Sequence, residues 1–247
     1  MPVTAEEDSF PAPIRSGLGC FKLLSAWEGH ADSCYRTRRN IRIFSPLGVD
    51  WTGGVWYNSG MNSTTTHRYL TVRNRATESF IGLLAQATLF DLHAAERWYS
   101  EAQGFANSLR PMTGWNMEVA ASVVSAFSPR VTWAHNKAKA AQYAQGIAPK
   151  GLRSHVAAAD RCIVEGFNGL RGLKTNAFAR AIAGDPNAVV VDVWMCRAAG
   201  LCKDAPNATE YRAIADAITA IAGTPTVNMA PATLQALLWI IVRGKAD

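Results

Sequence analysis

Long apolar runs are missing from this 247-residue sequence, and with them the usual sign of a membrane protein. No stretch reaches the roughly 18 apolar residues that a membrane-spanning helix needs. The first residues, MPVTAEEDSF, are acidic and have no apolar core, so they do not form a typical secretory signal. We therefore expect a cytoplasmic protein with no membrane partner.

Cysteine and histidine are also few, and their spacing argues against a metal site. The five cysteines are odd in number and scattered, so a disulfide framework is not expected. Cys20, His30 and Cys34 come closest to a zinc site, but their spacing fits no standard pattern. None of the five histidines lies in a metal-binding or triad arrangement. We predict ordinary buried thiols and no cofactor.

The composition is typical of a soluble globular protein with a net positive charge. Apolar residues make up 49% of the chain, and its length allows one large domain or a core domain with a smaller appendage. The formal net charge is +6, and arginine supplies 18 of the 25 basic residues. Arginine makes bidentate contacts with phosphate, and a basic protein releases counterions when it binds nucleic acid. The charge favours a nucleic-acid partner, but basic proteins without such a partner have it too.

Residues 1–76 differ from the rest of the chain, with many Gly, Ser, Thr, Asn and aromatic residues and few helix formers. Short strands are predicted at 41–44, 54–57 and 67–72. An arginine cluster lies close to three aromatic residues: Arg36, Arg38, Arg39 and Arg42 near Trp51, Trp56 and Tyr57. Such a mixture can follow a nucleic-acid backbone and stack on bases. It is equally typical of a solvated edge whose aromatic side chains pack on the core.

Residues 77–247 are predicted to be a helical core, because apolar residues recur there at helical spacing. Helices are expected at 80–87, 92–105, 115–127, 131–144, 155–166, 193–199, 209–222 and 231–242. The 115–127 helix follows Thr113, a suitable N-cap, and its valines and alanines predict a buried central position. The predicted fold class is therefore mainly α, with an irregular N-terminal extension that carries short strands.

The most informative stretch runs from Gly169 to Arg197: GLRGLKTNAFARAIAGDPNAVVVDVWMCR. A Gly-rich turn leads into a helix that begins with Lys174 and Thr175, and a second turn precedes an apolar run that ends on Asp192. The run is too apolar for a surface loop, so it carries one carboxylate into a mostly dry setting. Burial of a lone carboxylate is costly and is often a sign of function. We expect Lys174 and Asp192 to meet at one cleft.

This order of elements resembles the helix-hairpin-helix DNA glycosylases, most closely their endonuclease III branch. That family has a Gly-rich hairpin, a helix that opens with Lys-Thr, a short apolar run ending in the catalytic Asp, and a helix with an early Arg. The corresponding parts of this chain are 169–173, Lys174-Thr175, 189–192 and Arg197. The resemblance extends from about residue 82 to the end and includes a hairpin at 167–175. It implies the helix-hairpin-helix glycosylase fold, double-stranded DNA as the partner, and a monomer.

Two further segments support the resemblance, and two features depart from it. Residues 125–128 (Ser-Ala-Phe-Ser) resemble the Ser-Ala-Gln turn that family members push into the duplex, and 238–244 resemble a late helix beneath the catalytic cleft. The hairpin here is Gly-x-x-Gly, whereas the family usually has Gly-x-Gly, which changes the expected phosphate geometry. Many relatives hold an iron–sulfur cluster on four C-terminal cysteines. No cysteine follows Cys202 here, so no cluster is expected.

The resemblance implies catalytic roles for Asp192 and Lys174. A carboxylate beneath the sugar stabilises the positive charge that develops when an N-glycosidic bond breaks, and it orients or deprotonates the nucleophile. In bifunctional family members the lysine attacks C1′, forms a Schiff base and permits strand cleavage. The alternatives are structural: Asp192 as the N-cap of the next helix, and Lys174 as a phosphate contact or an exposed side chain.

The hairpin and the turn after the 115–127 helix are the expected DNA contacts, although the hairpin can also be an ordinary helix–helix connection. Glycines there let the backbone approach phosphate and favour positive φ, while the two leucines anchor the turn. Phe127 is the expected wedge that fills the space left by a flipped base. The expected DNA-contacting residues are Gly169, Leu170, Arg171, Gly172, Leu173, Thr175, Phe127, Ser128 and Arg130. The expected base pocket comprises Trp133, His135, Asn136 and Trp194.

The function predicted on this basis is that of a DNA glycosylase, which flips a base out of the duplex and cleaves its N-glycosidic bond. The unfamiliar N-terminal segment suggests an enlarged or covered base pocket, and hence a bulky modified pyrimidine like those in viral DNA. Such an enzyme would act in base excision repair or in antiviral defence. Two alternatives stay open: a DNA-binding protein of the same fold that lacks catalysis, and an enzyme that exchanges or modifies bases of hypermodified viral DNA.

Overall fold

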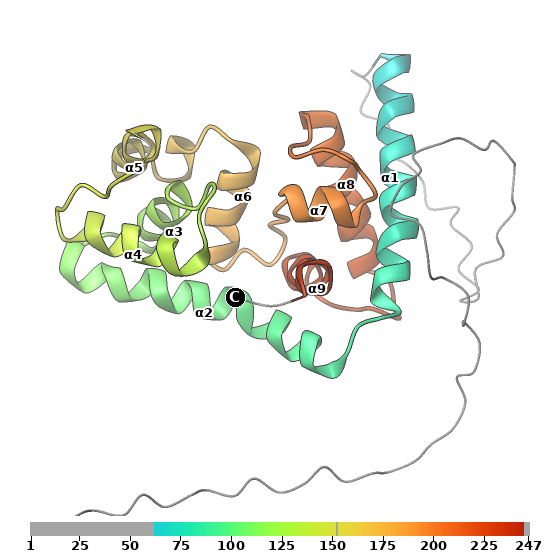
Figure 1. Ribbon diagram of the computed structural model, residues 1–247, viewed down its shortest axis with the longest axis horizontal. Coiled ribbons are helices and arrows are strands. Elements are labelled where there is room, and N and C mark those ends of the chain that lie inside the picture. Colours follow the sequence, from blue (N-terminus) through green and yellow to red (C-terminus); the bar gives the residue numbers. More distant parts are fainter. Residues whose placement is uncertain (1–61, 152, 245–247) are drawn as a thin grey trace, which may run out of the picture. The chain divides into compact units, whose positions relative to one another are not determined.

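The structure of the protein is a computed structural model that describes residues 62–151 and 153–244. These residues form helices and contain no β-strand, so the predicted mainly α class is confirmed. In chain order the elements are α1 (Ser63–Leu84), α2 (Leu89–Thr113), α3 (Met117–Ala126), α4 (Trp133–Ala144), α5 (Arg153–Glu165), the 3-10 helix η1 (Gly166–Gly169), α6 (Leu173–Ile182), α7 (Val193–Ala198), α8 (Ala208–Ala222) and α9 (Pro231–Arg243) (Figure 1). Within this part of the chain, no helix could span a lipid bilayer.

Helix α1 corrects part of the N-terminal prediction. The strand expected at 67–72 is wrong, because these residues lie inside α1, and the expected domain boundary at residue 76 falls within the same helix. Val72, Ala76 and Phe80 recur every fourth residue and are buried. Helical periodicity over this longer window outweighs the β-forming residues of the short segment.

Other predictions concern residues that lie outside the described part of the chain. They are the strands at 41–44 and 54–57, the cluster of arginines and aromatic residues, and the candidate zinc ligands Cys20, His30 and Cys34. These predictions stay predictions.

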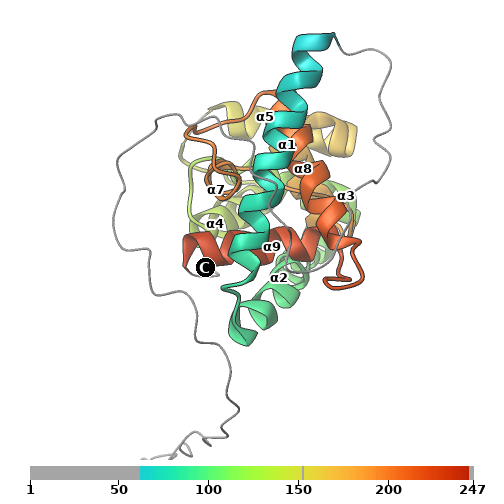
Figure 2. The same ribbon diagram turned by 90° about the vertical axis from the view of Figure 1, so that its right-hand side faces the viewer.

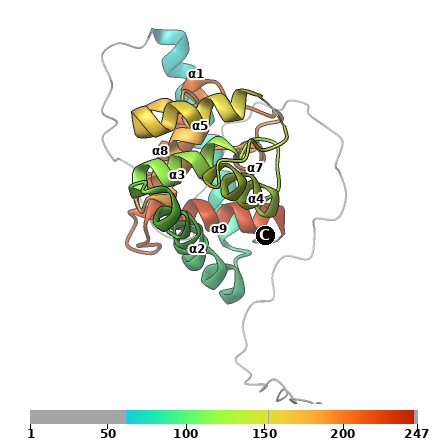
Figure 3. The same ribbon diagram turned by 90° about the vertical axis from the view of Figure 1, so that its left-hand side faces the viewer.

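The helices form two groups that meet along α2 and α9. In the first group, α3 packs against α2, α5 and α6, and α4 lies beside it (Figures 1 and 3). In the second group, α1 packs along α8, with α7 and α9 next to them (Figure 2). A smaller apolar cluster joins α2 to α9. The segment between α6 and α7 passes from the first group to the second, and it carries Asp192 at its end.

Helix α3 is the buried centre of the first group, as its alanines and valines predict. Every residue of Ala120–Ala126 is buried. The N-cap is Asn116, whose side chain accepts a hydrogen bond from the N–H of Val119, and the expected cap, Thr113, is instead the last residue of α2. The predicted central helix is thus present, but it begins after a different capping residue.

Two of the three described cysteines are buried, and the third, Cys202, is exposed. Cys162 and Cys196 are completely buried, and burial raises the pKa of each thiol to about 11. Neither forms a disulfide. They therefore act as small apolar side chains of the two cores.

A buried carboxylate ties the second group together. Glu210, in the first turn of α8, is 3% exposed and accepts hydrogen bonds from Arg68 of α1 and from Lys203 of the α7–α8 loop. Burial acts to raise the pKa of this carboxyl, but hydrogen bonds from Lys203, Arg68 and the Asn207 backbone outweigh it and lower the pKa from 4.5 to about 2. The ionised carboxylate therefore stabilises the contact between α1 and α8.

This pKa predicts an acid-sensitive contact. Because the folded value lies below the unfolded one, Glu210 adds stability above about pH 4.5 and loses it as the pH falls towards about 2. We expect Glu210→Gln to lower the free energy of unfolding near neutral pH and to flatten its decline below about pH 5. Chemical denaturation across this range measures both effects, with the exposed Glu78→Gln on α1 as the control. An unchanged pH dependence in Glu210→Gln would contradict the prediction.

Candidate active site

A cleft of about 410 Å³ opens where the two helix groups meet. Its walls come from α2, α4, α6 and α9, from the loop before α4 and from the segment before α7. Its volume lies at the low end of the range of about 300–1,000 Å³ that is usual for ligand pockets. Lys174 and Asp192 both line it, so the two residues predicted to be catalytic do share one cleft.

Asp192 stands at the N-terminus of α7 with both carboxylate oxygens engaged. Its Oδ1 accepts hydrogen bonds from the backbone N–H groups of Trp194 and Met195, at 2.9 and 3.0 Å, so Asp192 is the N-cap of α7. Its Oδ2 accepts a hydrogen bond from the indole Nε1 of Trp239 in α9, at 3.2 Å. The capping role therefore coexists with a place on the cleft, and three N–H donors fix the carboxylate there.

The valine run before Asp192 is held in both hydrophobic cores. Val190 packs in the core of the first group, whereas Val189 and Val191 pack in that of the second. The hydroxyl of Tyr211 donates a hydrogen bond to the Val189 carbonyl at 2.8 Å and accepts one from the Val191 amide at 3.3 Å. Burial raises the pKa of Tyr211 to about 12, so the phenol stays a neutral donor. These contacts fix the position from which Asp192 projects.

Aromatic rings form much of the cleft wall. The ring of Trp98 contacts those of Trp133 and Trp239, with centroid separations of 5.8 and 5.2 Å. Phe178 of α6 meets Trp133 edge to face at 6.4 Å. Flat apolar walls of this kind suit a planar ligand that stacks on the rings.

The charged side chains of the cleft are mostly positive. Arg130, Lys174 and Arg243 line it, and Asp192 is the one carboxylate among the described lining residues. Arg130 is exposed and has a φ of 61°, a left-handed conformation that is uncommon for a residue other than glycine. The guanidinium of Arg243 lies over the ring of Trp239, 4.6 Å from its centroid. This excess of positive charge favours a polyanionic ligand.

The hairpin occupies the expected place, but the expected backbone angles are wrong. Positive φ occurs at Gly166 (57°) and at neither Gly169 nor Gly172. Gly166 leaves room for Glu118 of α3, whose Oε1 accepts a backbone hydrogen bond from the hairpin at 2.9 Å. Gly169 allows η1 to lie against α5, because a Cβ there would come within 2.6 Å of the Cys162 backbone nitrogen. The glycines therefore serve close packing of the hairpin more than unusual dihedral angles.

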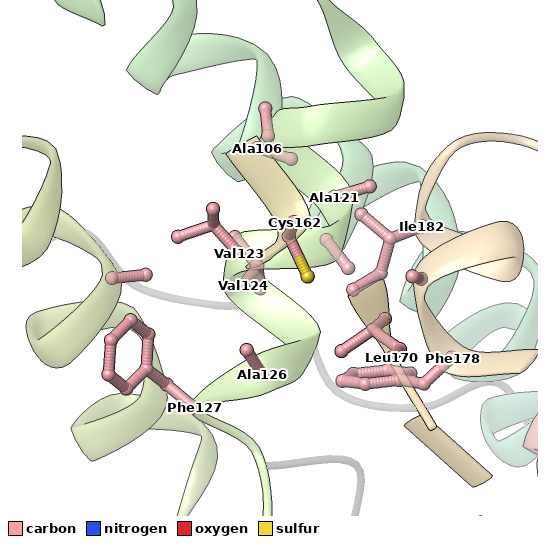
Figure 4. Close-up of a cluster of buried hydrophobic side chains, with 14 of the residues drawn as sticks. Ala106, Ala121, Val123, Val124, Ala126, Phe127, Cys162, Leu170, Phe178 and Ile182 are labelled. Atoms are coloured by element: carbon pink, nitrogen blue, oxygen red, sulfur yellow. The ribbon is translucent and has the colours of Figure 1, made fainter. Parts of the chain in front are cut away.

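The hairpin residues expected to contact phosphate are divided between surface and core. Leu170 is 6% exposed and anchors the turn beside Phe178, as Figure 4 shows, whereas Leu173 is 53% exposed. Arg171 is exposed, while the hydroxyl of Thr175 donates a hydrogen bond to the Gly172 carbonyl. Among the described residues, no side chain caps α6. Its first N–H groups are therefore available to an anion.

Phe127 is not the expected wedge. Its ring is 1% exposed and packs against that of Tyr143, with centroids 5.5 Å apart, and Figure 4 shows it within the buried cluster of the first group. Phe127 is the C-cap of α3 and continues the buried face of that helix. Ser128 and Arg130 do line the cleft, so the accessible part of the turn begins one residue later than expected.

Three of the four residues expected in the base pocket line the cleft. They are Trp133, Asn136 and Trp194. The expectation for His135 is wrong: it is exposed, and its Nδ1 lies 2.8 Å from the hydroxyl of Thr132, the N-cap of α4. Residues three apart share one face of a helix, as Trp133 and Asn136 do, whereas His135 lies between them in sequence and faces elsewhere.

Several lining residues were not expected from the sequence, among them Trp98 and Tyr99 of α2, and Gln235 and Trp239 of α9. Both helices are distant from the hairpin in sequence, and their packing against each other brings these side chains to Asp192. The resemblance of 238–244 to a helix beneath a catalytic cleft was one pointer to α9. A glutamine within the apolar 231–242 segment was a second signal, because buried amides need partners.

Comparison with known families gives one match. Residues 61–246 match the model of a family described as a family of unknown function (DUF7178). The chain belongs to the DUF7178 family. No curated protein and no solved structure matches it. The DUF7178 match begins just before Asn62, the N-cap of α1, and so includes every helix that frames the cleft.

Gly169 and Gly172 allow a matched test of hairpin packing. We expect Gly169→Ala to lower the free energy of unfolding by about 1–3 kcal/mol, because its Cβ would meet backbone atoms of α5. The nearest atom to a Cβ at Gly172 is the Thr175 hydroxyl at 3.2 Å, which can move, so Gly172→Ala should cost clearly less. Urea denaturation of the two variants measures the difference. Equal losses would show that the contact with α5 does not matter.

Substitutions of Asp192 separate its capping role from its charge. Asn caps helices about as well as Asp, whereas Ala does not. We expect Asp192→Ala to lower the free energy of unfolding by about 1 kcal/mol. Asp192→Asn should lower it less, because its amide oxygen can keep the cap although its NH2 group loses the hydrogen bond from Trp239. Denaturation curves of the three proteins test this. If Asn destabilises as much as Ala, the contacts with Trp194 and Met195 are not a functional cap.

Proposed function

We propose that this DUF7178 protein is a DNA glycosylase that hydrolyses the bond between C1′ of a deoxyribose and a base rotated out of the duplex. The supporting observation is the Asp192 carboxylate, which three N–H donors hold in an aromatic cleft shared with Lys174. The resemblance of 169–197 to the helix-hairpin-helix glycosylases supports the same assignment. Asp192 is the catalytic residue of the proposal.

Asp192 suits the stabilisation of positive charge on the sugar. When the C1′–N bond breaks, its electron pair leaves with the base, and the sugar becomes oxocarbenium-like. A carboxylate has about four acceptor positions. Three of them are filled by N–H groups of Trp194, Met195 and Trp239. The last can orient a water whose oxygen bonds to C1′, while the proton that the water loses neutralises the departing base.

Several groups around the cleft suit a DNA backbone. The uncapped N-terminus of α6 offers N–H groups and a partial positive charge to a phosphate. Lys174 and Arg243 add positive charge to the cleft. Arg130 holds a strained left-handed backbone at the turn after α3, and we assign to it, in place of Phe127, the space that a flipped base would leave.

Mass spectrometry of released bases tests the proposal. Duplexes carrying natural, damaged and modified bases, including bulky 5-substituted pyrimidines, are incubated with the full-length protein. We expect wild type to release one class of base and leave an abasic site. Asp192→Asn should keep its fold and its DNA affinity but release the base at least about 100-fold more slowly. Comparable release by both proteins would contradict the role of Asp192.

Other outcomes of the same experiment select the alternative functions. Binding of duplex DNA by wild type without release of any base would identify a DNA-binding protein that lacks catalysis. A product strand that carries a different base would identify an enzyme that exchanges or modifies bases. Mass spectrometry of the strand as well as the supernatant distinguishes these results.

Lys174 provides a separate test of strand cleavage. A lysine amine that bonds to C1′ of an abasic site expels water and forms an imine, which borohydride reduces to a stable protein–DNA adduct. We expect such an adduct with wild type and none with Lys174→Gln. Base release without any adduct in wild type would make the enzyme monofunctional, with Lys174 as a phosphate contact.

A further inference from the structure

Two buried amides line the cleft, and the chemistry proposed at Asp192 uses neither of them. Asn136 of α4 is 2% exposed, and Gln235 of α9 is 4% exposed. Burial of an amide is unfavourable unless its donor and acceptor groups find partners. Both side chains are therefore expected to have hydrogen-bond partners.

Asn136 has an unpaired group in the described structure. Its Oδ1 is buried and accepts no hydrogen bond. The hydroxyl of Ser128, which lines the same cleft, is also buried and unpaired. Native structures leave few buried polar groups unsatisfied, and those that remain call for a physical reason. A ligand in the cleft would supply partners for both.

Gln235, by contrast, is held in one orientation. Its Oε1 accepts a hydrogen bond from the hydroxyl of Tyr99 at 2.6 Å. Tyr99 is buried, and burial raises the pKa of the phenol above its usual value, so the phenol stays protonated and donates. This contact fixes Oε1 towards Tyr99. The Nε2 NH2 group of Gln235 is then the part of the amide that can donate to a ligand.

We propose that Asn136 and Gln235 are specificity-determining residues that bind the hydrogen-bonding edge of a planar heterocyclic base stacked on the tryptophans of the cleft. This inference rests on the proposed function. Nε2 of Gln235 donates to a ring nitrogen or carbonyl oxygen of the base, and Oδ1 of Asn136 accepts from a neighbouring ring N–H or exocyclic amine. The ligand is therefore a ring that presents an acceptor beside a donor. A ring without the donor leaves Asn136 unpaired and is rejected.

Asn136→Leu tests the inference because leucine is similar in size and has no polar group. Since the substitution removes an unpaired buried group, the variant should unfold at the same temperature as wild type or higher. The kcat/KM of the variant for a duplex that carries the preferred base should nevertheless fall at least about 10-fold, while its affinity for the duplex stays unchanged. A purely structural residue would not combine these results. Gln142→Leu, an exposed amide on the same helix, is the control and should change neither property.

Tyr99→Phe tests the fixed orientation of Gln235. Without the hydroxyl of Tyr99, the amide of Gln235 can rotate and present either its donor or its acceptor to the base. We expect this variant to discriminate less between bases whose donor and acceptor positions are exchanged, measured as the ratio of their rates of release. Unchanged discrimination would remove Gln235 from the proposal and confine it to Asn136.

Tryptophan fluorescence measured with free uracil, thymine, cytosine, adenine and guanine separates this inference from the glycosylase proposal. We expect one class of base to quench wild type and to lose that effect in Asn136→Leu. Quenching that depends on Asn136, without base release from any duplex, would keep the inference and overturn the glycosylase. Base release with unchanged rate and preference in Asn136→Leu would overturn the inference alone. Neither quenching nor release in wild type would overturn both.

Discussion

The carboxylate of Asp192 joins α7 to α9 at the cleft. Its Oδ1 caps α7, and its Oδ2 accepts a hydrogen bond from Trp239 of α9. The valines before it enter the cores of both helix groups, and Tyr211 of α8 fixes their backbone. A carboxylate bound in this way has little freedom to move, so the geometry of the cleft depends on it.

Several departures from ordinary packing lie at the cleft that contains this carboxylate, while the unpaired Ser122 and His155 lie elsewhere. Arg130 has a left-handed backbone, and Asn136 and Ser128 keep unpaired polar atoms. All three line the cleft. Proteins commonly tolerate local strain and unsatisfied groups where a ligand makes use of them, which is why the cleft is the best candidate for function.

Local sequence patterns predicted most helices after residue 117 to within a few residues, because amphipathic periodicity and capping residues act over a few turns. The helices expected at 80–87 and 92–105 have wrong bounds, since α1 ends at Leu84 and α2 extends to Thr113. Local patterns also predicted that Lys174 and Asp192 share a cleft. They failed where a short window was used alone. Residues 67–72 looked like a strand until the spacing of their apolar neighbours was extended to Phe80. Phe127 was expected to be accessible because 125–128 resemble a turn that enters the DNA duplex, although it caps the buried face of α3.

The sequence by itself determined the helical class, the Gly-rich hairpin and the carboxylate that ends an apolar run, because these follow from side-chain chemistry at close spacing. Only the tertiary structure decided what surrounds that carboxylate. Trp98, Gln235 and Trp239 line the same cleft from helices far away in the chain, and Trp239 donates a hydrogen bond to the carboxylate. The packing of α2 against α9 brings them there, and such packing depends on the shapes of whole helix faces, which no local pattern records.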